Sequence, residues 1–199
     1  MRIEPDRLLI DSAIRGDADA CGEIYLLLKD SIYSFAVRMT NDTAVAEEIT
    51  QDVFVFFVQN GDRFDPDKGS LFSFLCGVAR NKILNHLTRS GTRLERSETE
   101  PGDLNGTDGS PVGSPLNLLL GKEFSEVLEE GITALSALQR EALLLREMEE
   151  LSYKEISEIT ETEVSVIKGR IHRARKALAV SLAPYLKDSR TNAYELHRS

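Results

Sequence analysis

The sequence predicts an all-α fold made of two small helical domains joined by a flexible linker, the second of which contains a helix-turn-helix. Three observations predict this fold. Apolar residues recur at spacings of three and four on both sides of a central segment. That segment is rich in Gly, Pro, Ser and Asp. Near the end of the chain, two short amphipathic stretches are joined by a tight connection.

The chain has 199 residues, of which 41% are hydrophobic and 29% are charged. This is enough to bury one moderate core or two small ones, and the pattern favours two. We expect a first domain over residues 1–90, a disordered linker over 91–115, a second domain over 116–184 and a flexible tail over 185–199.

The first domain is expected to contain four helices with a loop before the last. Their predicted ranges are Asp6–Arg15, Asp19–Met39, a helix capped by Asn41 or Asp42 that runs to about Gln59, and Ser70 to about Thr88. Two Gly residues, a Pro and three Asp residues predict the loop between Gly61 and Gly69.

The third of these helices has two apolar faces. Its inward stripe is Val45, Ile49, Val53, Phe56 and Phe57. The opposite face carries Glu47, Gln51, Phe54, Val55 and Val58. A helix that already has a complete core stripe and a second, partly apolar face needs another surface to cover it. The pattern alone supports a protein partner and an intramolecular helix equally.

Phe64 lies in the predicted loop and belongs to no helical stripe. It can plug the neighbouring core, or it can stack on an unpaired base of single-stranded nucleic acid. The helix that follows has its apolar stripe at Leu71, Leu75, Val78, Ala79 and Ile83, and directs Phe74, Arg80, Asn81, Leu84 and Thr88 outward. An aromatic side chain and cations are therefore expected near the loop.

Helical periodicity resumes at Leu116 and predicts helices to about Leu135 and over Ala137–Met148. A helix-turn-helix follows over Leu151–Leu178. Ser152 and Glu155 have the spacing of a capping box, and Thr162 is the expected cap of the second helix. The buried stripe of that second helix is predicted to be Val164, Ile167, Ile171, Ala174 and Leu178.

The opposite face of this helix is cationic. Ser165, Gly169, His172, Arg173 and Lys176 lie on it, with Lys168, Arg170 and Arg175 on its flanks. A solvated charged face, or a purely structural bundle of three helices, explains many such runs. The position on the second helix of a helix-turn-helix favours DNA binding, and Gly169, which weakens the helix, suggests that another group approaches closely there.

The formal net charge of −9 hides a separation of charge. Residues 80–93 and 164–186 contain nine basic residues and no acidic ones. The rest of the chain has 15 basic residues against 33 acidic ones, a balance of −18. Basic surfaces suit nucleic-acid phosphate, whereas the acidic remainder would repel DNA and could bind a basic protein.

The sequence contains none of the common catalytic or nucleotide-binding motifs. His86, His172 and His197 lack metal-ligand spacing, and Cys21 and Cys76 are expected to be buried free thiols. Neither a run of about 20 apolar residues nor a signal-peptide core is found. We therefore expect a cytoplasmic, non-enzymatic protein with no metal, no cofactor and no insertion into membranes.

These residues together resemble the bacterial extracytoplasmic-function (ECF) sigma factors, from about Leu8 to Leu182. The motifs that match are AEEITQDVF (Ala46–Phe54), FLCGVARN (Phe74–Asn81), LSYKEI (Leu151–Ile156) and IKGRIHRAR (Ile167–Arg175). Two differences stand out. The family usually has Gly in the turn of the helix-turn-helix, where this chain has Glu161, and Pro-x-Gly-Thr at the start of the recognition helix, where it has Glu163, Ser165 and Val166.

The resemblance implies a subunit of RNA polymerase that recognises promoters. The AEEITQDVF helix would dock on the clamp of the β′ subunit through Glu47, Glu48, Gln51, Asp52, Phe54 and Val55. Phe64, Phe74, Arg80, Asn81 and Leu84 would contact the minus-ten element, with Phe64 and Asn81 holding a flipped base. Ser165, Lys168, Gly169, Arg170, His172, Arg173, Arg175 and Lys176 would contact the minus-thirty-five element. The polymerase β flap and an anti-sigma factor would be further partners.

A second hypothesis is a stand-alone helix-turn-helix transcription regulator, in which the N-terminal half is a sensing or dimerisation module. A structural or adaptor protein is a third class, but it would leave both basic segments without a purpose. The hypotheses are separated by adding the chain to polymerase core and testing a promoter that core alone does not use.

Overall fold

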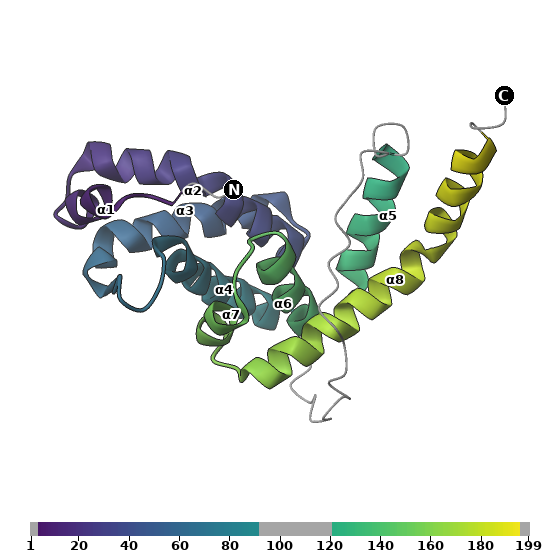
Figure 1. Cartoon of the computed structure of the whole chain (residues 1–199). Coiled ribbons are helices and arrows are strands. Elements are labelled where there is room, and N and C mark those ends of the chain that lie inside the picture. Colours follow the sequence, from purple (N-terminus) through teal and green to yellow (C-terminus); the bar gives the residue numbers. More distant parts are fainter. Residues whose placement is uncertain (1–3, 92–120, 196–199) are drawn as a thin grey trace.

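The computed structural model describes residues 4–91 and 121–195, and every regular element in these ranges is a helix (Figure 1). The elements are α1 (Arg7–Ile14), α2 (Ala18–Thr40), α3 (Thr43–Asn60), the 3₁₀ turn η1 (Gly61–Arg63), α4 (Leu71–Arg89), α5 (Gly121–Ala134), α6 (Ala137–Glu147), α7 (Tyr153–Thr160) and α8 (Val164–Glu195). The predicted all-α fold is confirmed. Nearly all of the predicted linker, 91–115, lies outside the described residues.

Side-chain caps fix the starts of the N-terminal helices. Asp6, Asp17, Asp42 and Ser70 each accept a backbone N–H from the first turn of α1, α2, α3 and α4. Such caps satisfy amide groups that have no partner inside the helix. α2 ends at Asn41, whose φ of 54° lies in the left-handed region that Asn tolerates. The expected helix boundaries in this half therefore agree with the structure to within a few residues.

The helix-turn-helix begins as predicted. The Ser152 hydroxyl accepts the Glu155 N–H, and the Glu155 carboxylate accepts the Ser152 N–H, which completes the capping box of α7. The predicted cap of the next helix is wrong. The Thr162 hydroxyl instead donates to the Thr160 carbonyl oxygen, and the first backbone bonds of α8 return to the Glu163 carbonyl.

Two further expectations for α8 need correction. Val164 is exposed, because it is the first residue of the helix and lies before the contact with α6 and α7. The predicted flexible tail, 185–199, is helical as far as Glu195. Pro184 lies inside this helix. Proline has a helical φ but removes one backbone hydrogen bond, and its ring crowds the carbonyl four residues earlier, so Pro184 weakens α8 at this point.

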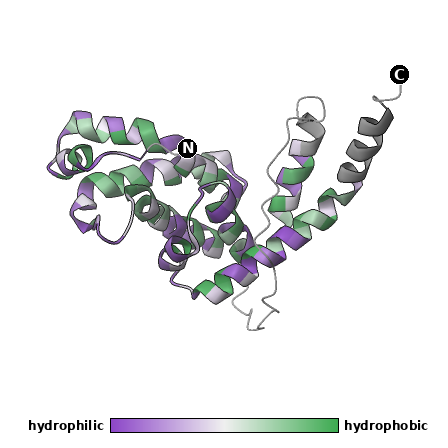
Figure 2. Cartoon of the chain, in the orientation of Figure 1, coloured by the Kyte–Doolittle hydropathy of each residue, from purple (hydrophilic) through white to green (hydrophobic). Residues whose placement is uncertain are grey.

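The two halves of the chain pack against each other, which differs from the expected pair of separate cores. α4 contacts α7, and α2 contacts both α5 and α6. A single cluster of buried apolar residues extends from Ile10 in α1 to Ile171 in α8. Figure 2 shows hydrophobic and hydrophilic residues interleaved along the helices, the pattern of helices that bury only one side.

Arg140 in α6 joins the ends of two helices. Its guanidinium donates to the carbonyl oxygens of Arg38 and Met39 at the end of α2, and to those of Ile132, Thr133 and Leu135 around the end of α5. These are carbonyls for which the helices themselves provide no donor. One side chain therefore caps a helix from each half of the chain.

Within the described part of the chain, no helix is long and apolar enough to cross a membrane. Both cysteines are free thiols, as expected. Cys76 is buried, whereas Cys21 is only partly so. Burial and the nearby Asp17 carboxylate raise the pKa of the Cys21 thiol, which keeps it in the unreactive protonated form.

Candidate nucleic-acid interface

α8 presents a cationic face next to the turn of the helix-turn-helix. Ile167, Ile171 and Ala174 are buried and fix the rotation of the helix against α6 and α7. Ser165, Lys168, His172, Arg175 and Lys176 are exposed, and Gly169, Arg170 and Arg173 are half-buried. Three of the five residues predicted to be buried are buried, so the predicted orientation of this helix is largely correct.

Contacts within the motif hold several of these cations in place. The Lys168 Nζ lies 5.4 Å from the centroid of the Tyr153 ring, and the Arg146 guanidinium carbon lies 4.8 Å from the same centroid. Both distances are typical of cation–π contacts. The Arg175 Nε donates to the Glu147 Oε1 at 3.0 Å, on the flank of the cationic face.

Gly169 lies next to the side chain of Arg173. A Cβ atom at this position would lie 3.4 Å from the Arg173 Nη1. The group that approaches the glycine in this structure is therefore the guanidinium of Arg173, one turn later on α8. Arg173, expected at the centre of the exposed face, is half-buried.

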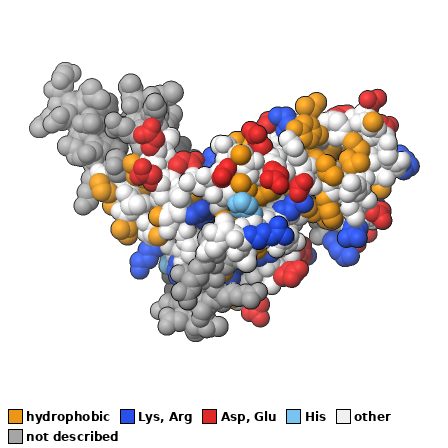
Figure 3. Space-filling view, turned by 180° about the vertical axis from the view of Figure 1, so that it is seen from behind, with side chains coloured by type: hydrophobic (Ala, Val, Ile, Leu, Met, Phe, Trp, Pro, Cys, Tyr) orange, Lys and Arg blue, Asp and Glu red, His pale blue; other side chains and the backbone are white. Residues whose placement is uncertain are grey.

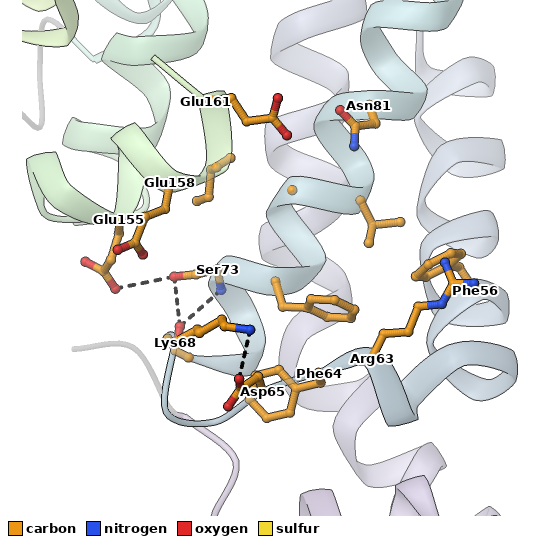
Figure 4. Close-up of a pocket in the computed structure, with 16 residues that line it drawn as sticks. Phe56, Arg63, Phe64, Asp65, Lys68, Ser73, Asn81, Glu155, Glu158 and Glu161 are labelled. Atoms are coloured by element: carbon orange, nitrogen blue, oxygen red, sulfur yellow. Dashed lines mark hydrogen bonds and ion pairs between the residues drawn. The ribbon is translucent and has the colours of Figure 1, made fainter. Parts of the chain in front are cut away.

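A second candidate surface surrounds the loop before α4. Phe64 is only 9% exposed, and its ring centroid lies 5.7 Å from that of Phe74. In this conformation the loop aromatic packs against α4. Asn81 is exposed, and Phe74 and Leu84 are half-buried. Phe64, Phe74 and Asn81 all line one cleft of about 440 Å³, which α7 closes on the opposite side (Figure 4).

Arg80 was expected to point outward, and this expectation is wrong for the structure. Its side chain is 14% exposed, and its Nε donates to the Glu141 Oε1 at 2.7 Å. Glu141 belongs to α6 and is 0% exposed. Burial raises the pKa of this carboxyl group, and the positive charges of Arg80 and Arg170 oppose that rise. One buried carboxylate therefore lies close to an arginine from each basic segment.

The outward face of α3 forms a third candidate surface. Glu47, Glu48, Gln51 and Asp52 are exposed, and Val55 is 53% exposed. The Asp52 carboxylate accepts from the Lys82 Nζ of α4 at 2.7 Å. All of the predicted docking residues on this helix are exposed except Phe54.

Phe54 is 8% exposed, so its predicted outward position is wrong. Its ring meets the edge of the Tyr25 ring with the centroids 4.9 Å apart. α2 wraps around α3 far enough to cover this position as well as the inward stripe. An intramolecular helix therefore covers part of the second apolar face, while Val55 and Val58 stay open.

Tyr25, Phe54, Val55 and Val58 line a largely apolar groove of about 490 Å³ between α2 and α3. Leu26 is also exposed on α2. Figure 3 shows hydrophobic side chains gathered at the end of the molecule formed by α1 to α3. Neither Tyr25 nor Leu26 was predicted to form part of a surface, although both fall outside the main apolar stripe of their helix.

The structure shows no group of three or more His, Cys, Asp or Glu side chains arranged to hold a metal ion, within the residues it describes. The acidic residues of the three surfaces face arginine or lysine partners, helix N–H groups or solvent. The three surfaces are thus a cationic helix, a loop with aromatic side chains, and an apolar groove with carboxylates nearby.

Comparisons with known proteins agree with this description. Residues 24–93 match the family described as sigma-70 region 2, and residues 125–178 match the family described as sigma-70, region 4. The first match includes α3, the loop and α4, and the second includes the helix-turn-helix. All three candidate surfaces lie inside the matched segments.

Curated relatives extend along most of the chain. The RNA polymerase sigma-H factor of Pseudomonas aeruginosa is 29% identical over 190 residues, which are 94% of this chain and 98% of that protein. The ECF RNA polymerase sigma factor SigW of Bacillus subtilis is 29% identical, with 84% and 91% covered. The ECF RNA polymerase sigma-E factor of Escherichia coli K12 is 25% identical, with 92% and 96% covered.

Solved structures share the fold. The sigma factor RpoE of Bartonella quintana, in complex with the anti-sigma factor NepR, aligns with a TM-score of 0.61 at 24% identity over 81% of this chain and 96% of that one. CnrH, in complex with the cytosolic domain of CnrY, aligns with a TM-score of 0.63 at 20% identity over 90% and 97%. Matched regions, relatives and fold together show that the chain belongs to the ECF group of the sigma-70 family, the sigma factors that direct RNA polymerase to promoters.

Proposed function

We propose that residues 1–90 bind the RNA polymerase core and the minus-ten element, and that residues 116–184 bind the minus-thirty-five element. The observation that carries this proposal is the cationic face of α8, which follows a capped α7 in a helix-turn-helix. In that motif the second helix lies in the major groove of DNA. Each of the three surfaces then has one role.

The α8 face has residues suited to both kinds of DNA contact. Ser165, Lys168, Gly169 and His172 lie on the exposed side of the first turns, which meet base edges when a recognition helix enters the groove. Arg173 faces the same side, and guanidinium groups pair well with guanine edges. Arg170, Arg175 and Lys176 lie farther along or on the flanks and are assigned to phosphate.

The minus-ten surface combines Phe64, Phe74, Arg80, Asn81 and Leu84. Two aromatic rings and an amide close together can hold an unstacked base, because stacking contributes about 1–3 kcal/mol per base and the amide bonds to its edge. Arg80 would contact the adjacent phosphate. The loop lies between η1, whose Gly61 is buried, and α4, whose Leu71, Phe72 and Leu75 belong to the core, so both ends of the loop are fixed.

The α3 face is assigned to the polymerase clamp on the β′ subunit. Val55 and Val58 offer apolar contact area, and Glu47, Glu48, Gln51 and Asp52 surround it with negative charge and hydrogen-bonding groups. An apolar centre with a charged rim is the usual composition of a protein interface. Phe54 is buried beneath this surface, where its ring packs against the ring of Tyr25. The β flap would contact the second domain.

The remaining partners follow from the family. One solved structure with the same fold is bound to the anti-sigma factor NepR, and we propose that an anti-sigma factor also binds this chain. A protein that works on polymerase and DNA would act in the cytoplasm. It would hold no metal or cofactor and would not itself be an enzyme, because the catalytic groups belong to the polymerase.

Reconstituted transcription tests the whole proposal. Purified chain and polymerase core are mixed with promoters selected from a random library by the reconstituted holoenzyme. The expected result is transcription that depends on the chain. Binding to DNA without any effect on core would instead support the stand-alone regulator.

The docking surface is tested by Val55→Arg, which places a charge in the apolar groove. Leu8→Arg is the matched control, since Leu8 is also an exposed apolar residue but lies on α1, outside the groove. We expect Val55→Arg to weaken binding to core at least tenfold, and Leu8→Arg to leave it unchanged. Equal effects of the two variants would remove the groove from the proposal.

A further inference from the structure

A carboxylate lies at the N-terminal end of the recognition helix. Glu163 is the residue before α8, and its carbonyl oxygen accepts the Val166 N–H at 3.0 Å and the Ile167 N–H at 3.1 Å. The backbone of Glu163 therefore starts the helix, and these bonds do not use its side chain. Glu163 is exposed, so its carboxylate is open to solvent or to a molecule that binds α8.

Ser165 draws this carboxylate towards the DNA-facing side of α8. The Ser165 hydroxyl donates to the Glu163 Oε2 at 3.3 Å. Ser165 is exposed and belongs to the same cationic face as Lys168 and His172. The carboxylate thus lies on the side of α8 assigned to DNA, at the end where a recognition helix meets base edges.

A carboxylate in this place is unsuited to phosphate. The basic residues of the cationic face attract the DNA backbone, whereas a negative charge on the same face repels it. The positive end of the helix dipole favours a negative charge at the start of α8, so the carboxylate is compatible with the helix itself. A favourable contact with DNA then requires a hydrogen-bond donor on a base edge.

The bases differ in the donors that they present in the major groove. A carboxylate accepts hydrogen bonds and donates none. Guanine and thymine present only acceptors in this groove, whereas cytosine presents its N4 amino group and adenine its N6 amino group. Adenine also has the N7 acceptor beside N6, which would face the second carboxylate oxygen. Cytosine is therefore the base that best fits Glu163.

We propose that Glu163 selects a cytosine in the minus-thirty-five element by accepting from its N4 amino group, and that it disfavours guanine and thymine at the same position. The inference rests on the proposed role of α8 in binding that element. Ser165 is a positioning residue, because its hydroxyl holds the carboxylate on the DNA-facing side. The ECF pattern of Pro-x-Gly-Thr has neither side chain, so this preference would distinguish the chain from members with that pattern.

The reconstituted holoenzyme tests the assignment with a promoter library randomised across the minus-thirty-five element. Bound promoters are sequenced for the parent, Glu163→Ala, Glu163→Gln and Ser165→Ala. Glu126→Ala is the matched control, since Glu126 is an exposed residue of α5 and this variant changes the net charge by the same amount as Glu163→Ala.

The parent should favour cytosine over guanine and thymine at one position by at least about fivefold, the lower end of what a specific base contact contributes. Glu163→Ala should lose this preference, chiefly by binding better to promoters that the parent rejects. Glu163→Gln should favour adenine, because an amide can donate to N7 and accept from N6. Ser165→Ala should reduce the cytosine preference without moving it to another base, and Glu126→Ala should keep the parent preference.

A parent that favours cytosine nowhere in the element, or a Glu163→Gln variant that keeps the parent preference, would overturn the proposal. Equal loss of preference in Glu126→Ala and Glu163→Ala would also overturn it, because net charge would then be the cause. Urea denaturation separates reading from folding. A Glu163→Ala variant that loses stability but keeps the parent preference would show that Glu163 acts only on the helix.

Transcription by the parent holoenzyme reports on the proposed function separately. If the parent supports no transcription from any selected promoter, the proposed function fails. The same library is then selected with the full chain alone, as a stand-alone regulator would bind it. The comparison of Glu163→Gln with the parent in that selection still decides whether the carboxylate reads cytosine.

Discussion

Replacing Arg140 by Met tests how far one side chain holds the two domains together. Arg140 donates to five carbonyl oxygens, among them Met39 O at 3.1 Å in α2 and Ile132 O at 3.0 Å in α5. Methionine keeps the length and much of the volume of the side chain but has no donor. The carbonyls at both helix ends would then rely on solvent or remain unsatisfied.

The magnitude follows from the contacts. A hydrogen bond from a charged group contributes about 1.5–3 kcal/mol, and bonds from one guanidinium do not add fully. Burial also opposes the charge, as the lowered pKa of Arg140 indicates. We therefore expect a net loss of about 3 kcal/mol in the free energy of unfolding. In a chain of this size, that corresponds to roughly 6–12 °C in Tm.

Urea denaturation followed by circular dichroism at 222 nm measures the loss. Arg7→Met, an exposed arginine of α1, is the control and should change stability by less than about 0.5 kcal/mol. Arg140→Lys should fall between the two, since an ammonium group cannot reach as many carbonyls at once. A loss below about 1 kcal/mol for Arg140→Met would show that the helix ends are satisfied without it.

Three further predictions follow from single contacts. Ser152→Ala removes one half of the capping box and should cost about 1 kcal/mol in the urea-derived free energy of unfolding. Burial raises the pKa of Glu141 in the folded protein above its ordinary value of 4.5. The stability that this carboxyl group contributes is therefore present below pH 4.5 and is lost as the pH rises through the raised pKa. The parent should lose stability relative to Glu141→Gln between acidic and neutral pH. In the holoenzyme, Arg175→Ala should lower promoter affinity equally on all sequences and reduce the slope of log affinity against log salt concentration by roughly 1. Arg173→Ala should instead relax the sequence preference at one or two base pairs. Equal behaviour of the two variants in a salt titration on matched and mismatched promoters would contradict these assignments.

Local features of this fold could be predicted from the sequence because local interactions determine them. The caps at Asp42, Ser70 and Ser152 depend on groups two or three residues away, and the buried stripe of α8 depends on helical spacing alone. The same reasoning failed where a distant element decides burial. Phe54 is buried because Tyr25, on another helix, covers it.

The packing of the two domains against each other shows the limit most clearly. Arg80 and Glu141 are sixty-one positions apart in the chain and are separated by the segment predicted to be a linker. Each lies in an ordinary amphipathic helix, and neither helix contains a signal that selects the other as its neighbour. The pairing depends on the shapes of two folded domains, which residue spacing does not encode.

Glu161 ends α7 with a φ of 50°, in the left-handed region where a side chain costs about 1 kcal/mol relative to glycine. Glycine, which has no Cβ atom, would relieve this strain. In this chain the carboxylate instead lines the cleft, opposite Asn81 (Figure 4). A substitution to glycine should therefore change two properties at once: the helix-turn-helix would become more stable, and the cleft would lose a negative charge.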